Sequence, residues 1–264
     1  MKKVVSLLLS IVTIIGIVSS EINAYASGWL DNVQNLEFDT NYSMCWIGTN
    51  MSVDYDAFQF SVPSYGTVNL NISSENVYYI SSWYTNEFTS YYIYSSNDLN
   101  NYLVKWNYQN EDSRGYNSAL GEYYENYSNT LSAGDYYLVV KYKFDIYGNN
   151  VSGDTYELQL SYKPIFSNTS ISKLQARKKA FRVLWNKASN VTGYQIQYST
   201  KKNFKDSKII NVAGASTAGK KVKKLKAKTK YYVRVRTYKI VNVNGKNKTY
   251  YGKWSSKKTV KTKK

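Results

Sequence analysis

The sequence predicts an all-β protein of two tandem β-sandwiches, and three observations lead to that fold class. Five segments alternate apolar and polar residues with a period of two, which puts one set of side chains in a core and the other in water. Helical periodicity is weak throughout the chain. Gly or Asn turn signals separate the short segments, as is typical of sandwiches. The alternating segments are 58–62, 68–72, 156–160, 194–198 and 233–236.

Residues 1–26 are predicted to be a secretory signal peptide. Lys2 and Lys3 precede an apolar run over residues 4–18, and residues 24–26 (Ala-Tyr-Ala) give the small-x-small cleavage pattern. We expect cleavage after Ala26; the alternative is an uncleaved N-terminal anchor. No later stretch approaches the ~20 apolar residues of a membrane span. The mature protein is therefore expected to be secreted and extracellular, of bacterial type, and either released or held at the cell surface by noncovalent contacts.

The composition excludes several kinds of chemistry. The 264 residues include one Cys and no His. A single thiol rules out an internal disulfide framework and a Cys-based zinc site, and without imidazole the commonest general base is absent. Cys45, between Met44 and Trp46, is expected to be a buried apolar residue. These counts favour a non-catalytic protein.

The charge of the chain changes sign near Pro164. Residues 27–165 hold 5 basic and 16 acidic side chains, a net charge of −11, whereas residues 166–264 hold 28 basic side chains and one acidic one, Asp206, a net charge of +27. A single domain does not normally divide in this way. The predicted organisation is a signal peptide at 1–26, an acidic Tyr-rich sandwich at 27–163, a linker at 164–170 and a basic sandwich at 171–264.

The basic half resembles a fibronectin type III domain. Residues 183–185 (Val-Leu-Trp) and 193–198 resemble its strands B and C, and Leu225, Tyr231 and residues 233–236 resemble its E–F corner and strand F. The resemblance implies a disulfide-free sandwich in which the Tyr231 hydroxyl bonds to the backbone across the corner. The usual Pro-Gly of the corner is replaced here by Ala-Lys at 227–228.

Aromatic residues of the basic half are expected to be structural. Trp185 alternates with Val183 on one strand, so its indole is predicted to lie in the core. Arg234 and Arg236 are predicted to face outward, and Trp254 on the neighbouring strand is expected to stack between them in a cation–π ladder.

The strongest functional signal of the basic half is a lysine run, seven lysines within eleven residues. A surface that only needs to be soluble requires a net charge of ~2–8, far below +27. The run therefore predicts attraction to a polyanion outside the cell, namely an anionic cell-envelope polymer or an acidic glycan; a solubilising surface is the alternative. No base-reading motif is present, so no specific nucleic acid is expected. The run comprises Lys220, Lys221, Lys223, Lys224, Lys226, Lys228 and Lys230.

The acidic half resembles the bacterial pre-peptidase C-terminal (PPC-like) domains. Residues 54–63 and 66–70 resemble their opening strands, residues 131–140 their later L-x-A-G-x-Y-Y strand, and residues 156–160 would close the sheet. The resemblance implies a jelly-roll-like sandwich that accompanies secreted proteins and has no chemistry of its own.

Two candidate sites lie in the acidic half. Asp54 and Asp56 flank a strand start and leave room for calcium, although a polar turn is the alternative; no other cofactor is expected. Aromatic residues with a flat apolar face and a polar tip suit a sugar or a protein partner, with a Tyr-rich structural surface as the alternative. The residues proposed for that contact are Trp83, Tyr84, Tyr91, Tyr94 and Trp106.

Together these signals favour a secreted, non-catalytic binding or adhesion protein. The cationic domain would associate with anionic surface polymers and the aromatic-rich sandwich would contact a glycan or protein. The alternatives are a structural spacer without a tight ligand, and a secreted carbohydrate-active enzyme that uses carboxylates such as Glu111, Glu122 and Glu125.

Overall fold

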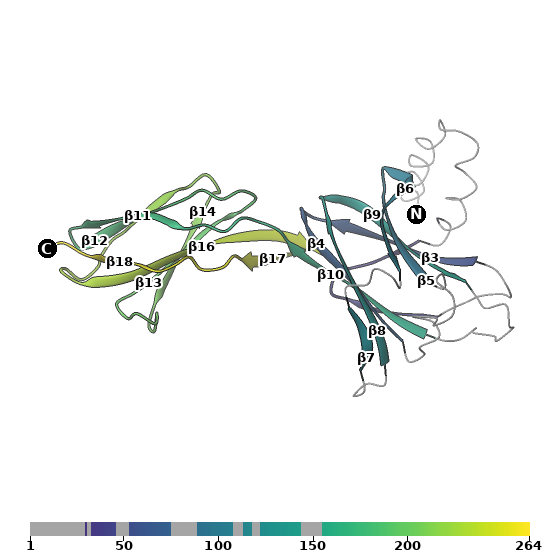
Figure 1. Cartoon of the computed structure of the whole chain (residues 1–264). Helices are drawn as coiled ribbons and strands as arrows, with labels where there is room; N and C mark the ends of the chain where they lie inside the picture. The colour runs from purple at the N-terminus through teal and green to yellow at the C-terminus, as the bar shows by residue number, and fades with distance from the viewer. Residues whose placement is uncertain are drawn as a thin grey trace. The chain divides into compact units, whose positions relative to one another are not determined.

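The computed structural model is an all-β protein (Figure 1), which confirms the predicted fold class. It describes residues 30, 33–45, 53–74, 89–107, 113–117, 122–143 and 155–264. The predicted signal peptide lies outside these residues. Among the residues described, none belongs to a helix with the length and apolar character needed to cross a bilayer.

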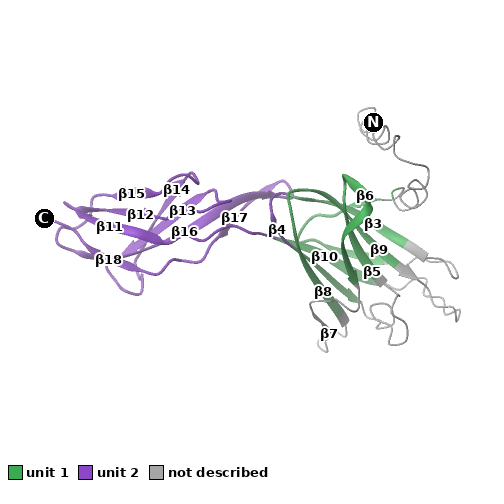
Figure 2. Ribbon diagram, turned by 45° about the horizontal axis from the view of Figure 1, so that its top comes forward, with its two compact units in different colours: residues 1–62, 68–162 green, residues 63–67, 163–264 purple. Residues whose placement is uncertain are grey.

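The chain forms two compact units (Figure 2). Unit 1 comprises Met1–Val62 and Val68–Tyr162, and unit 2 comprises Pro63–Thr67 and Lys163–Lys264. The division after Tyr162 lies close to the start of the segment predicted as a linker.

Unit 1 contains two five-stranded sheets. One sheet has the order β1-β3-β9-β5-β6 and the other β2-β10-β4-β8-β7. The strands of the first sheet are β1 (Gln34–Asn35), β3 (Val53–Val62), β9 (Gly134–Lys143), β5 (Thr89–Ser95) and β6 (Asp98–Asn107). Those of the second are β2 (Asn41–Cys45), β10 (Thr155–Pro164), β4 (Gly66–Ser74), β8 (Glu122–Leu131) and β7 (Ser113–Asn117).

The period-two pattern of the sequence decides which side chains of unit 1 form its core. The three segments predicted as strands from their alternation bury every second residue, because successive side chains point to opposite faces of a sheet. Elsewhere the alternation is broken, as at Leu138, Val139 and Val140 of β9, which are all buried. The buried members of the predicted strands are Phe58, Phe60, Val62, Val68, Leu70, Ile72, Tyr156, Leu158 and Leu160, none more than 2 % exposed.

Unit 2 is a sandwich of a three-stranded sheet, β11-β12-β15, and a second sheet, β14-β13-β16-β17, in which β18 also pairs with β16. The three-stranded sheet consists of β11 (Ile171–Arg177), β12 (Ala180–Trp185) and β15 (Gly219–Val222). The second consists of β14 (Lys208–Ala213), β13 (Gly193–Ser199), β16 (Lys230–Val243), β17 (Lys246–Tyr251) and β18 (Lys258–Lys261).

The apolar residues of the predicted strands form the core of unit 2. Phe181, Val183 and Trp185 of β12 pack in one cluster with Ile196 and Val235 of the facing sheet. Trp185 is 2 % exposed, as predicted, and its indole N–H donates to the Thr217 carbonyl at 3.0 Å.

The polar face of β13 differs from the prediction, because Gln195 and Gln197 are also buried. Arg236 and Arg234 donate hydrogen bonds to them there.

The segment predicted as a linker is bonded into unit 2. The Ser167 amide donates to the Ser189 carbonyl at 3.3 Å, and the Thr169 hydroxyl donates to the Asn186 carbonyl at 2.6 Å. Residues 165–169 therefore belong structurally to the basic sandwich.

Candidate polyanion-binding surface

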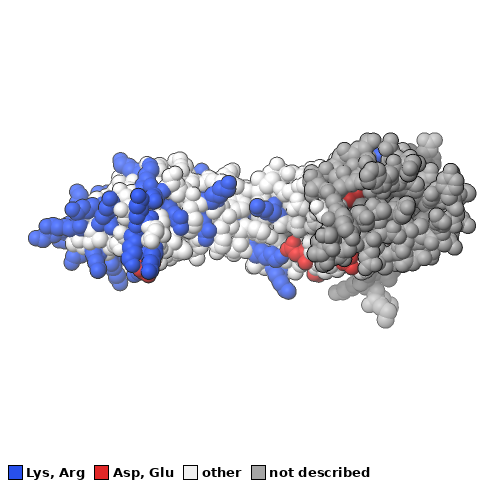
Figure 3. Space-filling model, turned by 60° about the horizontal axis from the view of Figure 1, so that its bottom comes forward, with Lys and Arg blue, Asp and Glu red and all other residues white. Residues whose placement is uncertain are grey.

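The lysine run spans β15, the following loop and the first residue of β16, and all seven of its side chains are exposed. Val222 is buried, Leu225 is half-buried against the core and Tyr231 is 6 % exposed. These three apolar side chains anchor the segment, so the lysines between them point to solvent. The face of unit 2 seen in Figure 3 carries many Lys and Arg side chains.

The E–F corner holds the loop of the lysine run in place. The Lys226 amide donates to the Tyr231 hydroxyl at 3.2 Å, which is the backbone contact that the resemblance implied. Lys224 and Lys228 adopt positive φ values of 58° and 50° where the loop turns.

The sheet register adds a like-charge pair to this surface. Lys221 of β15 lies directly opposite Arg182 of β12. Like charges opposite each other in a sheet are destabilising. Neither residue has an acidic side chain on the neighbouring strands of this sheet to neutralise it.

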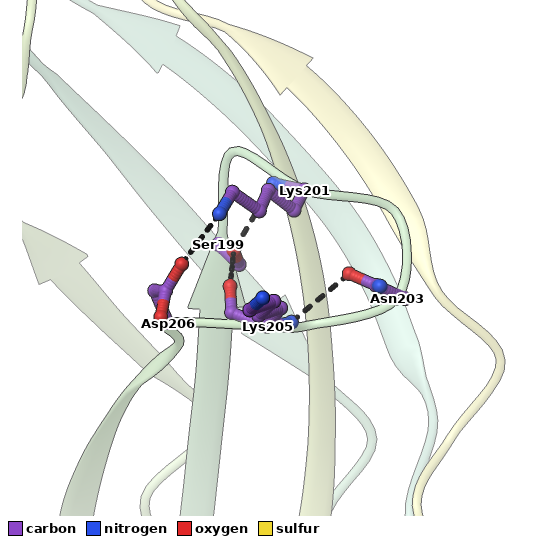
Figure 4. A network of polar contacts seen from close by, with 5 residues as sticks. All are labelled: Ser199, Lys201, Asn203, Lys205 and Asp206. Atoms are coloured by element: carbon purple, nitrogen blue, oxygen red, sulfur yellow. Dashed lines mark hydrogen bonds and ion pairs between the residues drawn. The ribbon is translucent and has the colours of Figure 1, made fainter.

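Asp206, the single acidic side chain of unit 2, is engaged elsewhere (Figure 4). Its carboxylate lies 2.5 Å from the Lys201 ammonium in the turn between β13 and β14. The Ser199 hydroxyl accepts from the Lys201 amide at 3.0 Å and donates to the Lys205 carbonyl at 2.9 Å, which closes the turn. Both partners of the ion pair are more than half exposed, so it contributes little stability.

The predicted cation–π ladder is present and is longer than predicted, although Trp254 lies in the segment between β17 and β18 and not on a neighbouring strand. The Arg234 and Arg236 guanidinium groups lie 4.7 Å and 4.3 Å from the Trp254 ring, on either side of it. Phe204 extends the stack beyond Arg234 at 4.2 Å, and Tyr251 beyond Arg236 at 4.0 Å. Burial lowers the pKa of both guanidinium groups.

Side-chain amides fix the two arginines of the ladder. The Arg234 Nε donates to Gln197 at 2.6 Å and the Arg236 Nε donates to Gln195 at 2.8 Å. The register of β13 against β16 sets these pairs opposite each other. These guanidinium groups therefore stabilise the fold, and their hydrogen bonds and ring contacts are made within unit 2.

The aromatic contact proposed for unit 1 needs correction. Tyr91 and Trp106 are 1 % and 4 % exposed. They lie opposite each other on the inward face of β5 and β6 and pack against Tyr127, at centroid distances of 5.3 Å and 5.7 Å. They are core residues and are not available to a ligand. Trp83 and Tyr84 lie outside the described residues, and Tyr94 remains partly exposed.

The structure groups the predicted Tyr94 with two further tyrosines on the opposite face of β5 and β6. Tyr92 and Tyr94 pack there against the buried Ala57 and Val139. Tyr92, Tyr94 and Tyr102 form an aromatic cluster with ring centroids 5.4–6.4 Å apart, and Tyr102 is 52 % exposed. The Lys105 ammonium lies 5.5 Å from the Tyr92 ring centroid. Burial, followed by the neighbouring tyrosines, raises the pKa of Tyr94. Alternation shows that each tyrosine doublet places one ring on each face, but it leaves open which ring is outward.

The structure describes the side chains of only some of the carboxylates proposed for catalysis or for calcium binding. Glu125 is 1 % exposed and accepts a hydrogen bond from the Tyr127 hydroxyl at 2.7 Å, so it is buried away from a substrate. Asp56 accepts from the Tyr156 hydroxyl at 2.8 Å. Glu111, and the side chains of Glu122, Asp54 and Cys45, lie outside the described parts. Within those parts no three His, Cys, Asp or Glu residues form a group suited to a metal ion.

The fold and the exposed lysines together define a protein of β-sandwich modules, one of them strongly cationic. Residues 166–257 match the family model of the fibronectin type III domain, which confirms the resemblance of the basic half. This domain indicates a module of the binding or adhesion type, and such modules are typically non-catalytic.

Solved structures also resemble the chain at low identity. The pre-peptidase C-terminal domain of collagenase from Bacillus anthracis has 19 % identity and a TM-score of 0.34, covering 49 % of this chain and 95 % of that one. A fibronectin type III domain of human contactin 1 has 16 % identity and a TM-score of 0.30, with coverages of 38 % and 82 %.

A β-1,2-glucanase from Parabacteroides distasonis has 12 % identity and a TM-score of 0.30, covering 80 % of this chain and 30 % of that one. Similarity at this level says nothing about activity. No curated protein matches the chain.

Proposed function

We propose that the protein is a secreted, non-catalytic binding protein whose fibronectin type III domain associates with anionic polymers outside the cell. The carrying observation is that all seven lysines of the run are exposed while the one acidic side chain of unit 2 is bonded to Lys201. The predicted signal peptide supports an extracellular location, where the partner would be a cell-envelope polymer or an acidic glycan.

Electrostatics make this binding non-specific in sequence and dependent on salt. Each ammonium group that neutralises an anionic group on a polymer releases a counterion, so affinity falls steeply as the salt concentration rises. The charge of the lysine run is not cancelled within unit 2, so its field extends over roughly the Debye length of ~8–10 Å into solution.

The test is a cell-wall pull-down with the full chain and a variant in which Lys220, Lys221, Lys223 and Lys224 are replaced by Gln. We expect the natural chain to be retained at about 50 mM salt and released at about 1 M salt, and the variant to be retained at least several-fold less. A neutral polymer, dextran, serves as the control matrix. Equal retention of the variant, or retention unchanged by molar salt, would contradict the proposal.

A second contact is favoured by the aromatic cluster of Tyr92, Tyr94 and Tyr102. Its rings offer flat apolar area with hydroxyl tips on an outward sheet face, a combination that suits sugar rings. We expect the full chain to bind a subset of a glycan array and Tyr102→Ser to lose those signals. Absence of any glycan signal would contradict this second contact and favour the structural-spacer alternative. Binding of a protein to the cluster would show that the partner is a protein and not a glycan.

A further inference from the structure

Three segments of unit 2 that are far apart in the sequence meet at one end of the domain. They are the turn between β11 and β12, the loop between β15 and β16, and the end of the chain after β18. The Lys179 amide donates to the Lys263 carbonyl at 3.1 Å, and the Leu225 amide donates to the Lys179 carbonyl at 3.0 Å. Figure 3 shows Lys and Arg side chains crowded at the end of unit 2 where Figure 1 marks the C-terminus.

A buried threonine secures this junction. Thr262 is 3 % exposed; its hydroxyl donates to the Lys226 carbonyl at 2.6 Å and accepts from the Thr229 amide at 3.0 Å. All of these contacts are made by backbone groups and one hydroxyl. The position of the lysines is therefore fixed without any use of their ammonium groups.

Six exposed lysines project from the junction, and we call them the lysine pole. Only three of them belong to the lysine run found in the sequence; the tertiary structure adds the other three. Asp206 is the only acidic side chain of unit 2, and it is bonded to Lys201 in the turn between β13 and β14. The pole consists of Lys178, Lys179, Lys224, Lys226, Lys228 and Lys263.

Three of the pole lysines occupy backbone conformations that disfavour lysine. Lys179, Lys224 and Lys228 have φ values of 44°, 58° and 50°. In this left-handed region Gly, Asn and Asp are favoured, because other side chains crowd the backbone. Elsewhere among the described residues, positive φ at a residue other than Gly falls on Asn or Asp in four cases of five. Lysine at these three turns therefore lowers the stability of the fold. It also brings ammonium groups together that repel one another, with no carboxylate beside them.

We propose that the lysine pole is a binding site for a linear polymer that carries phosphate groups. This inference rests on the proposed function and narrows it to one end of the domain and one ligand class. The six lysines present ammonium groups, which bind phosphate as compact point charges on flexible stems. The exposed Arg177, whose carbonyl accepts from the Lys263 amide at 2.8 Å, adds a guanidinium group beside them, and a guanidinium fork matches phosphate bidentately.

The test compares two full-chain variants that each lose three positive charges. The pole variant is Lys179→Asn, Lys224→Asn and Lys228→Asn, in which Asn suits the left-handed turns. The control variant replaces Lys187, Lys246 and Lys253 by Gln. Those three lysines are exposed. Lys187 follows the end of β12, Lys246 begins β17 opposite the end of β16, and Lys253 follows β17, so they lie toward the other end of unit 2. The length of β12 separates the two ends by roughly 20 Å, which exceeds the Debye length of about 14 Å at about 50 mM salt.

Binding is measured to long-chain inorganic polyphosphate at about 50 mM salt, and to polyglutamate as a carboxylate polymer. We expect the pole variant to bind polyphosphate about tenfold or more weakly, with a salt slope smaller by up to about 3, and the control variant to change less than about twofold. The natural chain should bind polyphosphate more tightly than polyglutamate. The melting temperature of the pole variant should equal or exceed that of the natural chain, because the strain at three turns is relieved.

Each alternative result has a defined meaning. Equal losses in the two variants would overturn the pole while leaving the proposed function standing, since binding would then follow overall charge. Equal or tighter binding of polyglutamate would overturn the phosphate assignment. A lower melting temperature in the pole variant would overturn the strain argument on which the site rests. Failure of the natural chain to bind any polyanion would overturn the proposed function itself.

Discussion

Replacing Trp254 with Ala should destabilise unit 2, because the substitution removes the central ring of the cation–π ladder on the sheet that contains β16. The indole lies between two guanidinium groups, at 4.7 Å from Arg234 and 4.3 Å from Arg236. The substitution removes both contacts and leaves the outer rings, Phe204 and Tyr251, each with one arginine.

The expected loss follows from the two contacts. A cation–π contact contributes ~0.5–1 kcal/mol at an exposed site and up to ~2 kcal/mol when desolvated. Both arginines remain partly exposed, so the value for an exposed site applies. Two contacts therefore amount to roughly 1–2 kcal/mol. For a domain of about 100 residues, each kcal/mol lowers the melting temperature by ~4–8 °C.

Scanning calorimetry of the full chain measures this loss, and a double-mutant cycle isolates its cause. The cycle combines Trp254→Ala with Arg234→Ala, and we expect a coupling energy of about 0.5–1 kcal/mol or more. The matched control is Arg182→Ala, because Arg182 lies on the other sheet and should show no coupling with Trp254. A melting temperature unchanged by Trp254→Ala, or a coupling to Arg182 as large as that to Arg234, would refute the reasoning.

Three further predictions concern stability. Tyr231→Phe keeps the buried ring but removes the acceptor of the Lys226 amide, so unit 2 should lose about 1 kcal/mol of unfolding free energy in a denaturant titration; no change would show that water replaces the contact. Burial first, and then the nearby Glu125 carboxylate, raise the pKa of the Tyr91 phenol, so the folded state retains this proton above the ordinary value of ~10, where the unfolded chain loses it. The free energy of unfolding should therefore fall as the pH rises above about 10, and tyrosinate absorbance should show that Tyr91 ionises only on unfolding. If Tyr91→Phe loses as much unfolding free energy above about pH 10 as the natural chain, the explanation is wrong. Gly193→Ala would place a Cβ against the backbone carbonyl oxygen of Val212 in β14, so the unfolding free energy should fall by roughly 1–3 kcal/mol; an unchanged unfolding free energy would mean that the strands separate at no cost.

The sequence alone determined the class of fold and much of the core. Period-two alternation identified strand faces correctly at Phe58, Leu158 and Ile196, because the alternation of side chains along a strand is a local property of the backbone. The corner contact of Tyr231 was also predictable, since it depends on a short local pattern. The stacking of Trp254 with two arginines was predicted, but its place in the segment between β17 and β18, and not on a strand, was not.

Only the tertiary structure decided which residues reach a surface together. Tyr91 and Tyr92 are adjacent and identical in type, yet one is core and the other is in the outward cluster, because the packing of the second sheet fixes the inward face. The lysine pole likewise depends on hydrogen bonds that join Lys179 to Lys263 and Leu225, residues separated by 84 and 46 positions. Net charge is a sum over the sequence, whereas a binding site is a position in space, and the position is set by long-range strand pairing.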